Sequence, residues 1–227
     1  MAHLFRDSPL APKIGVLGGA FNPLHFGHLR PAREVLDRLA LEKILFLPSG
    51  EHPLKKGSAM AATEDRLAML KLALAPESQF ELCDLDSKRP GISYSVDTLA
   101  ELANHYPDRE LVFIVGGDIL TELHLWKDWP KILDHSHMVM MVRPGFPAVT
   151  PADDRVASFL EQHRVDSHKQ LNCQETGLYG FMQLVVAPCA ISSTQIRDLV
   201  RNRTNIRSFT PDVVVDYIMQ NQLYLSE

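Results

Sequence analysis

A histidine pair follows two glycines near the start of the chain, in the segment Gly18–His28 (GGAFNPLHFGH). The apolar run Lys13–Leu17 before it predicts a strand, and the apolar spacing after it predicts a helix over His28–Leu39. Glycine lets backbone approach a ligand closely, and the free N–H groups of a helix's first turn attract phosphate. His25 and His28 are three residues apart around a glycine, so both imidazoles can face that point. The pattern is suited to stabilising charge on a phosphorus atom under attack.

A second candidate phosphate site lies far away in the sequence. The strand predicted over Phe181–Val186 leads into the segment ISSTQIR, residues 191–197. Ser193 is predicted to cap the next helix, and Arg197 follows one turn later at the same end. Hydroxyl groups, free amide N–H groups and a guanidinium together are typical of a phosphate site. One such helix start is usually structural, but two of them, each after a predicted parallel strand, indicate a nucleotide site.

Three other interpretations of these residues fail on spacing. A dinucleotide fingerprint needs the pattern G-x-G-x-x-G and an acid after the second strand, whereas this chain has Gly15, Gly18 and Gly19, then Pro48-Ser49. A P-loop needs Gly-Lys followed by Ser or Thr at the end of its glycine pattern, and the sequence contains none. Zinc ligation by His25 and His28 lacks a third clustered ligand.

Strands alternate with helices along the whole chain, which predicts βαβ units. We expect an α/β, Rossmann-like, doubly wound and mainly parallel sheet with helices on both faces. Thr63, Ser193 and Thr210 are predicted as helix N-caps, Pro31 is expected in the first turn of its helix, and a helical stretch should follow Asp118. The strands are expected at 13–17, 44–47, 80–83, 111–115, 138–142 and 181–186, and the helices at 28–39, 63–75, 95–106, 193–201 and from 211 onward.

Composition limits the remaining choices. The chain has 227 residues, 45% of them hydrophobic, and a net charge of −5, which argues against binding along a nucleic-acid backbone. Three cysteines without a CxxC pair favour a reducing cytosol, and no apolar run is long enough to span a membrane. Residues 1–12 are interpreted as a tail or extension and 13–227 as one domain, with connections at 143–152 and 166–180. The oligomeric state, including a homo-oligomer, is left open.

The two end motifs together resemble the HxGH nucleotidyltransferase superfamily, which shares its site plan with class I aminoacyl-tRNA synthetases. The segments between them resemble, more narrowly, the bacterial nicotinate-nucleotide adenylyltransferase family. The resemblance covers nearly the whole chain. It rests on SYSVDTL at 93–99, FIVGGDIL at 113–120, Trp126 with KIL at 131–133, RPG at 143–145 and PDVVVDYIMQNQLY at 211–224.

That resemblance implies a site for ATP. His25 and His28 would contact the phosphates, the backbone of Gly18 and Gly19 would line the nucleotide cleft, and Asp118 would contact a nucleotide sugar. Asp118 as a simple helix cap remains an alternative. The residues that would hold the triphosphate are Ser193, Thr194 and Arg197.

The resemblance also implies a pocket for a pyridine mononucleotide, formed by Tyr94, Thr98 and Trp126. An electron-poor pyridinium ring favours an indole face, which agrees with Trp126 stacking on the ring. Two structural alternatives stay open: Trp126 could belong to the core, and Thr98 could be a buried hydroxyl on a helix face.

The sequence departs from the family pattern at three places. Ala20 stands where Thr or Ser is usual, and Asn22 stands where Asp is usual. The loop after the second strand, expected to be long and exposed over 49–62, reads EHPLKK at 51–56 instead of Pro-Pro-His followed by Lys or Arg. Lys55 could still reach a phosphate, but the loop's histidine is displaced.

The implied reaction is transfer of AMP from ATP to nicotinate mononucleotide, giving deamido-NAD and pyrophosphate. His25, His28, Lys55 and Arg197 would supply the charge stabilisation. No carboxylate cage is evident, so Mg²⁺ would arrive with ATP. The alternatives are the same chemistry on the amide mononucleotide or on phosphopantetheine, a dual specificity, and a catalytically silent nucleotide-binding regulator.

Overall fold

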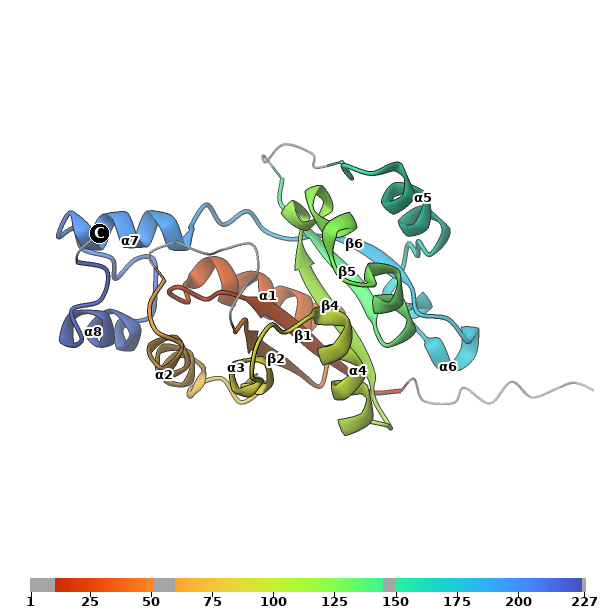
Figure 1. Ribbon diagram of the computed structural model, residues 1–227, viewed down its shortest axis with the longest axis horizontal. Helices are drawn as coiled ribbons and strands as arrows, with labels where there is room; N and C mark the ends of the chain where they lie inside the picture. Colours follow the sequence, from red (N-terminus) through yellow and green to blue (C-terminus); the bar gives the residue numbers. More distant parts are fainter. Residues whose placement is uncertain (1–10, 51–59, 145–149, 226–227) are drawn as a thin grey trace, which may run out of the picture.

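The computed structural model describes residues 11–50, 60–144 and 150–225. Within these ranges six strands form one sheet in the order β3-β2-β1-β4-β5-β6, and every neighbouring pair is parallel (Figure 1). The strands are β1 (Lys13–Gly19), β2 (Lys43–Pro48), β3 (Phe80–Leu82), β4 (Glu110–Gly116), β5 (His137–Val142) and β6 (Phe181–Val185). The sheet therefore confirms the predicted Rossmann-like α/β fold.

Helices cover both faces of the sheet (Figure 1). One face carries α1 (Phe26–Arg38), α2 (Thr63–Leu74), α7 (Ser193–Arg201) and α8 (Asp212–Gln220), and the other carries α4 (Ser95–His105) and α5 (Asp154–Gln162). Short helices connect them: α3 (Leu85–Lys88), α6 (Cys173–Thr176), η1 (Gly117–Thr121), η2 (Leu123–Leu125), η3 (Trp129–Asp134) and η4 (His168–Gln170).

The near-continuous apolar strands account for these two covered faces. Successive side chains of a strand point to opposite sides, so Phe113 packs into the core beneath α4 while Ile114 packs into the core beneath α1. Both are buried, with exposed fractions of 4% and 1%. An apolar residue at every position is what a sheet buried on both faces requires.

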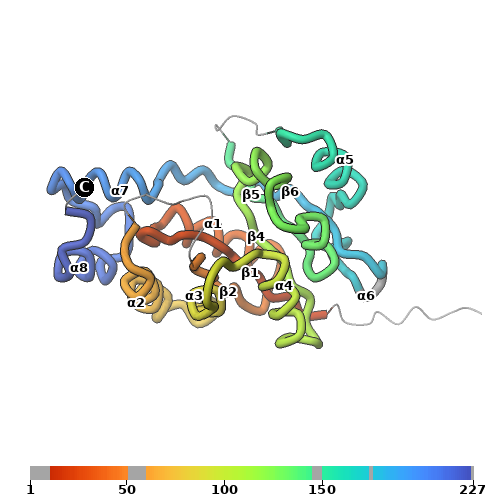
Figure 2. The backbone as a smooth tube through the Cα atoms, in the orientation of Figure 1, coloured from red at the N-terminus to blue at the C-terminus, as the bar shows by residue number. Residues whose placement is uncertain are grey.

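The strand order places a crevice between β1 and β4. The chain runs from β1 outward to β3 and then returns to the other side of β1 to build β4, β5 and β6 (Figure 2). Ligands of such sheets bind beyond the carboxyl ends of the strands, at the point where the order reverses. The glycine ends of β1 and β4, at Gly19 and Gly116, lie at this point.

Helix α1 begins earlier than predicted. His25 is its N-cap, and the carbonyl of His25 accepts hydrogen bonds from the N–H groups of His28 and Leu29, at 2.9 and 3.2 Å. The first turn therefore closes around Phe26, and the prediction that Pro31 lies in that turn is wrong. Pro31 lies in the second turn of α1, where it is buried.

Two of the predicted helix caps are wrong as well. Ala62 precedes α2, and the hydroxyl of Thr63 instead accepts a hydrogen bond of 3.1 Å from Arg66. Pro211 precedes α8, and the hydroxyl of Thr210 donates to the carbonyl of Leu24 at 2.7 Å. Thr63 therefore bonds within its own helix and Thr210 bonds to a distant loop, and neither hydroxyl caps the first turn.

Some elements were not predicted in detail. Helices α3 and α5 were absent from the prediction, and the helical stretch after Asp118 consists of the short 3₁₀ helices η1, η2 and η3. The predicted connection at 166–180 contains η4 and α6. Apart from α5, these helices are too short for an apolar spacing to show. The spacing of Val156, Phe159 and Leu160 does indicate α5, and the sequence analysis missed it.

Candidate active site

The two histidines lie together at the start of α1. Their rings stack with centroids 3.8 Å apart, and the edge of Phe21 meets His28 at 5.1 Å. The Nδ1 atoms of His25 and His28 are buried and have no hydrogen-bond partner among the described residues. A buried nitrogen without a partner is uncommon in a finished core, so this pair is suited to receiving a ligand.

Gly27 makes this arrangement sterically feasible. A Cβ atom at Gly27 would lie 2.8 Å from Nδ1 of His25 and 2.8 Å from the carbonyl oxygen of Ile191. A Cβ atom does not approach other atoms so closely, so any side chain at this position would clash. The glycine between the histidines therefore lets the His25 ring and the backbone before α7 both pack against the start of α1.

Burial keeps both imidazoles neutral. Desolvation, and then the nearby Arg143 guanidinium, lower the pKa of His25 to about 4. Burial is the main cause that lowers the pKa of His28 well below its usual value. Electrostatic repulsion from the protonated form of His25 and from Arg143 lowers it further. Both rings are thus uncharged at neutral pH, and Arg143 adds positive potential to the same region.

The second motif meets the first at this point. The guanidinium of Arg197 donates to the carbonyl of Asn22 at 2.8 Å and to the hydroxyl of Thr194 at 3.2 Å. The hydroxyl of Ser193 donates to the carbonyl of Pro23 at 3.0 Å. The two motifs predicted as phosphate sites are therefore parts of one site.

Ser193 is not the cap of α7, contrary to the prediction. Ser192 occupies the N-cap and accepts a hydrogen bond of 3.1 Å from the N–H of Gln195. Ser193 is the first helical residue, and its hydroxyl is directed to Pro23 instead. The cap thus precedes the motif's second serine by one residue.

The loop between the glycines and α1 is anchored by residues that the sequence analysis did not select. Arg66 on α2 is 1% exposed, and it donates to the carbonyl of Ala20 at 2.9 Å. The side-chain oxygen of Asn22 accepts from the hydroxyl of Tyr224 at 2.7 Å and from the N–H of Ala61 at 3.0 Å. The side chain of Asn22 is therefore used in holding this loop, whereas Ala20 takes part through its backbone.

The pattern around Arg66 could have revealed it. Arg66, Met69, Leu70 and Ala73 follow the i, i+3, i+4, i+7 spacing of a buried helix face, and all four are buried. An arginine on such a face needs a polar partner in the interior. Tyr224 lies beyond the last helix and gives no comparable signal.

A cavity of about 420 Å³ opens beyond the carboxyl ends of β1, β2 and β4. Gly18 and Gly19 line one wall, Asp118 lines another, and Tyr94 and Trp126 line a third. A side chain at Gly116 would collide with the Asp118 carboxylate, so the glycine permits that position. The structure thus brings these five residues, predicted from distant segments, to one cavity.

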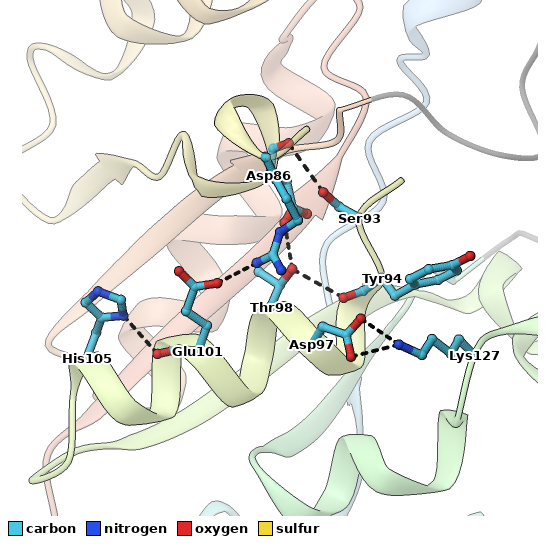
Figure 3. A network of polar contacts seen from close by, with 9 residues as sticks. Asp86, Ser93, Tyr94, Asp97, Thr98, Glu101, His105 and Lys127 are labelled. Carbon is cyan, nitrogen blue, oxygen red and sulfur yellow. Dashed lines mark hydrogen bonds and ion pairs between the residues drawn. The ribbon is translucent and has the colours of Figure 1, made fainter. Parts of the chain in front are cut away.

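Thr98 lies behind the cavity wall. It is fully buried, and its hydroxyl donates to the carboxylate of Asp86 at 2.6 Å (Figure 3). Asp86 itself lines the cavity, and burial raises the pKa of its carboxyl group. Thr98 therefore faces Asp86 rather than the cavity, which agrees with the buried-hydroxyl alternative.

Trp126 is half-buried and leans on Phe113 with ring centroids 6.4 Å apart, so one part of the indole remains at the cavity. Lys127 follows it, with its ammonium 4.9 Å from the ring centroid of Tyr94. Asp86 and Lys127 were not selected from the sequence. Lys55, predicted to reach a phosphate, lies outside the described residues.

No helix within 11–50, 60–144 and 150–225 is long and apolar enough to cross a membrane. The same ranges contain no cluster of three or more His, Cys, Asp or Glu side chains that could hold a metal ion. Cys83, Cys173 and Cys189 are free thiols.

The sheet topology and the joined motifs define a nucleotidyltransferase, and the chain belongs to the cytidylyltransferase-like family, whose sequence model matches residues 16–199. Within that group it belongs to the nicotinate-nucleotide adenylyltransferase family. It is 37% identical over 212 residues to the probable nicotinate-nucleotide adenylyltransferase of Shewanella woodyi, covering 93% of this chain and 99% of the relative. The corresponding Syntrophotalea carbinolica protein is 38% identical over 215 residues, covering 95% and 98%.

Solved structures support the same fold. Plasmodium falciparum nicotinic acid mononucleotide adenylyltransferase complexed with NaAD superposes with a TM-score of 0.69 at 15% identity, covering 94% of this chain and 97% of that one. A putative nicotinate-nucleotide adenylyltransferase from Vibrio parahaemolyticus gives a TM-score of 0.60 at 16% identity, covering 95% and 97%.

Proposed function

We propose that this protein transfers AMP from ATP to nicotinate mononucleotide and releases deamido-NAD and pyrophosphate. A phosphate oxygen of the mononucleotide attacks the α-phosphorus of ATP. The bond from that phosphorus to the bridging oxygen breaks, and pyrophosphate leaves with the electron pair. The observation that carries the proposal is the junction of the two phosphate motifs beside a cavity large enough for a nucleotide.

The triphosphate is assigned to the junction of the motifs. Arg197 carries a permanent charge and has more N–H donors than its two protein contacts use. His25 and His28 are neutral at pH 7, so each ring has one N–H that can donate a hydrogen bond to a phosphate oxygen. Ser193 and Thr194 add hydroxyl groups at the start of α7. Positioning and charge stabilisation, without a covalent intermediate, are sufficient for this chemistry.

The nucleosides are assigned to the cavity. Gly18 and Gly19 leave the wall open for close approach, and Asp118 supplies carboxylate oxygens for sugar hydroxyls. Tyr94 and Trp126 form the aromatic end for the pyridine ring. Thr98 acts through Asp86, because its hydroxyl is committed to that carboxylate.

Mg²⁺ is proposed to arrive on the ATP phosphates, where it neutralises charge. The described side chains at the motif junction are nitrogen and hydroxyl donors, which suit phosphate oxygens rather than the ion. Lys55 is proposed to add a further cation to the phosphates. A cytoplasmic location also stays a proposal, supported by the free thiols.

Pyrophosphate release with ATP against a panel of acceptors tests the function. The panel contains nicotinate mononucleotide, nicotinamide mononucleotide and phosphopantetheine, and a His28→Ala preparation purified in parallel excludes host enzymes. We expect the nicotinate substrate to exceed the amide by at least about tenfold in kcat/KM, because the helix start at Ser95 offers donors to its carboxylate. Equal values would indicate dual specificity, and ATP binding without turnover would indicate a regulator.

A further inference from the structure

The walls of the cavity carry an uneven set of charges. Three acids line it, Asp86, Asp118 and Glu122. Among the described residues that line the cavity, Lys127 is the only one with a cationic side chain. Carboxylates in this lining disfavour an entering anionic group, and Lys127 is the counter-charge that the described lining supplies.

Lys127 contacts two side chains of the protein, those of Asp97 and Tyr94. Its ammonium donates to both carboxylate oxygens of Asp97, at 2.8 and 3.1 Å, and lies 4.9 Å from the ring centroid of Tyr94 (Figure 3). Asp97 is in the first turn of α4, and Lys127 directly follows Trp126. The ion pair thus joins the two walls that hold the aromatic end of the cavity.

We propose that the charge balance within the Lys127–Asp97 pair tunes how strongly this site prefers an acidic over a neutral substituent on the pyridine ring. The proposal rests on the proposed function, which places that ring between Tyr94 and Trp126. The pair is nearly neutral as a whole, so the charge felt at this end of the cavity depends on both partners. Loss of either partner leaves the other one uncompensated.

The direction of each effect follows from electrostatics. Without Lys127, the Asp97 carboxylate adds a fourth negative charge near the ring and repels a ring carboxylate. Without Asp97, the ammonium is free to attract it. The two substrates share the phosphate and the pyridinium ring, and the amide substituent carries no charge. The ratio of the two substrates therefore isolates the charge of the ring substituent. Both side chains are about two-fifths exposed, which keeps the effects modest.

The experiment compares Lys127→Met, Asp97→Asn, the double variant and Lys127→Arg with wild type. Lys43→Met is the control, because Lys43 forms an ion pair with Glu81 at the start of β2, away from the cavity lining. For each protein kcat/KM is measured with the acid and the amide mononucleotide. Calorimetric binding of both is a second readout, and the measurements are made in low salt and in high salt.

We expect the acid-to-amide ratio to fall about two- to fivefold in Lys127→Met and to rise by a similar factor in Asp97→Asn. The double variant and Lys127→Arg should return close to the wild-type ratio. The changes should lie in KM rather than kcat, and high salt should reduce them. Lys43→Met should leave the ratio unchanged.

An unchanged ratio in Lys127→Met would overturn the inference, and so would equal losses with both substrates, which indicate a purely structural pair. The inference would also be contradicted if the double variant had an acid-to-amide ratio as low as that of Lys127→Met. Failure of the proposed function gives a different result, since wild type itself would then release no pyrophosphate with nicotinate mononucleotide. If wild type turns over nicotinate mononucleotide normally and the variants do not change the acid-to-amide ratio, only the role of the ion pair is excluded.

Discussion

The guanidinium of Arg197 donates a 2.8 Å hydrogen bond to the backbone carbonyl of Asn22, 175 residues earlier in the chain. This contact fixes the loop after β1 to the N-terminal half of α7. It places the histidines and the hydroxyls of α7 on one site, although each group sits on its own strand–helix unit. The site therefore depends on how the two ends of the domain pack.

Replacing Arg197 by alanine should mainly weaken ATP binding. The change removes a charge-assisted contact, worth about 1.5–3 kcal/mol, from the phosphate site. Binding of nicotinate mononucleotide should be almost unaffected. Calorimetry with each ligand measures the effect, and Arg201→Ala on the same helix is the control, since Arg201 pairs only with Asp198 among the contacts found in the described chain. Equal losses for both ligands would contradict separate subsites.

Replacing His28 by alanine should lower kcat at least about 100-fold while the fold survives. His28 stacks on His25. Under the proposed function its ring contacts the reacting phosphates, so its loss removes stabilisation from the transition state. Steady-state kinetics and circular dichroism measure activity and folding. His105→Ala is the control, because His105 is exposed at the end of α4. A variant within a few-fold of wild type would exclude the assigned role.

Acid should destabilise the protein through His25. Its pKa is about 4 in the folded chain, below the usual 6.5, so the unfolded chain binds more protons between these values. The contribution of neutral His25 to the free energy of unfolding is fully present above pH 6.5 and is lost as the pH falls toward 4. The loss is about 2 kcal/mol at pH 5. Urea unfolding at pH 7 and pH 5 should show a smaller loss in His25→Gln than in wild type. His105→Gln should keep the wild-type loss, and an identical loss in His25→Gln would refute the burial argument.

The fold was predictable because the strongest patterns are local. Continuous apolar strands such as the one containing Phe113 and Ile114, separated by helices, leave few alternatives to a buried parallel sheet. The helix caps failed for a physical reason. The hydroxyls of Ser193 and Thr210 donate to carbonyls far away in the sequence, and no local pattern encodes such partners. The hydroxyl of Thr63 accepts from Arg66, a buried arginine that also donates to the carbonyl of Ala20.

The site was predictable in part. Gly18, Gly19 and Asp118 could be expected at one cavity because they follow parallel strands. Asp86 and Lys127 could not, since their importance arises only when α3, α4 and the segment after β4 are folded together. The orientation of Thr98 away from the cavity likewise depends on the position of Asp86.

Replacing Thr98 by valine should cost about 1–3 kcal/mol of stability, because it leaves the buried Asp86 carboxyl without its 2.6 Å donor. Thr98→Ser keeps the donor and should lose less. Urea unfolding of the two variants measures this difference. If valine instead abolished mononucleotide binding at unchanged stability, Thr98 would contact the ligand directly.

Replacing Trp126 by alanine should weaken both pyridine mononucleotides to a similar extent, by about 1–2 kcal/mol, and leave ATP almost unaffected. Stacking acts on the ring and not on its carboxylate or amide, so the acid-to-amide ratio should stay constant, in contrast to the Lys127 variants. Trp126→Phe should retain part of the affinity. The control is Trp129→Phe, since Trp129 packs against Phe159 at 5.1 Å and does not line the cavity. Calorimetry with each mononucleotide, together with thermal unfolding, separates stacking from packing against Phe113. A core role for Trp126 predicts the opposite result, with unfolding at lower temperature and unchanged mononucleotide affinity.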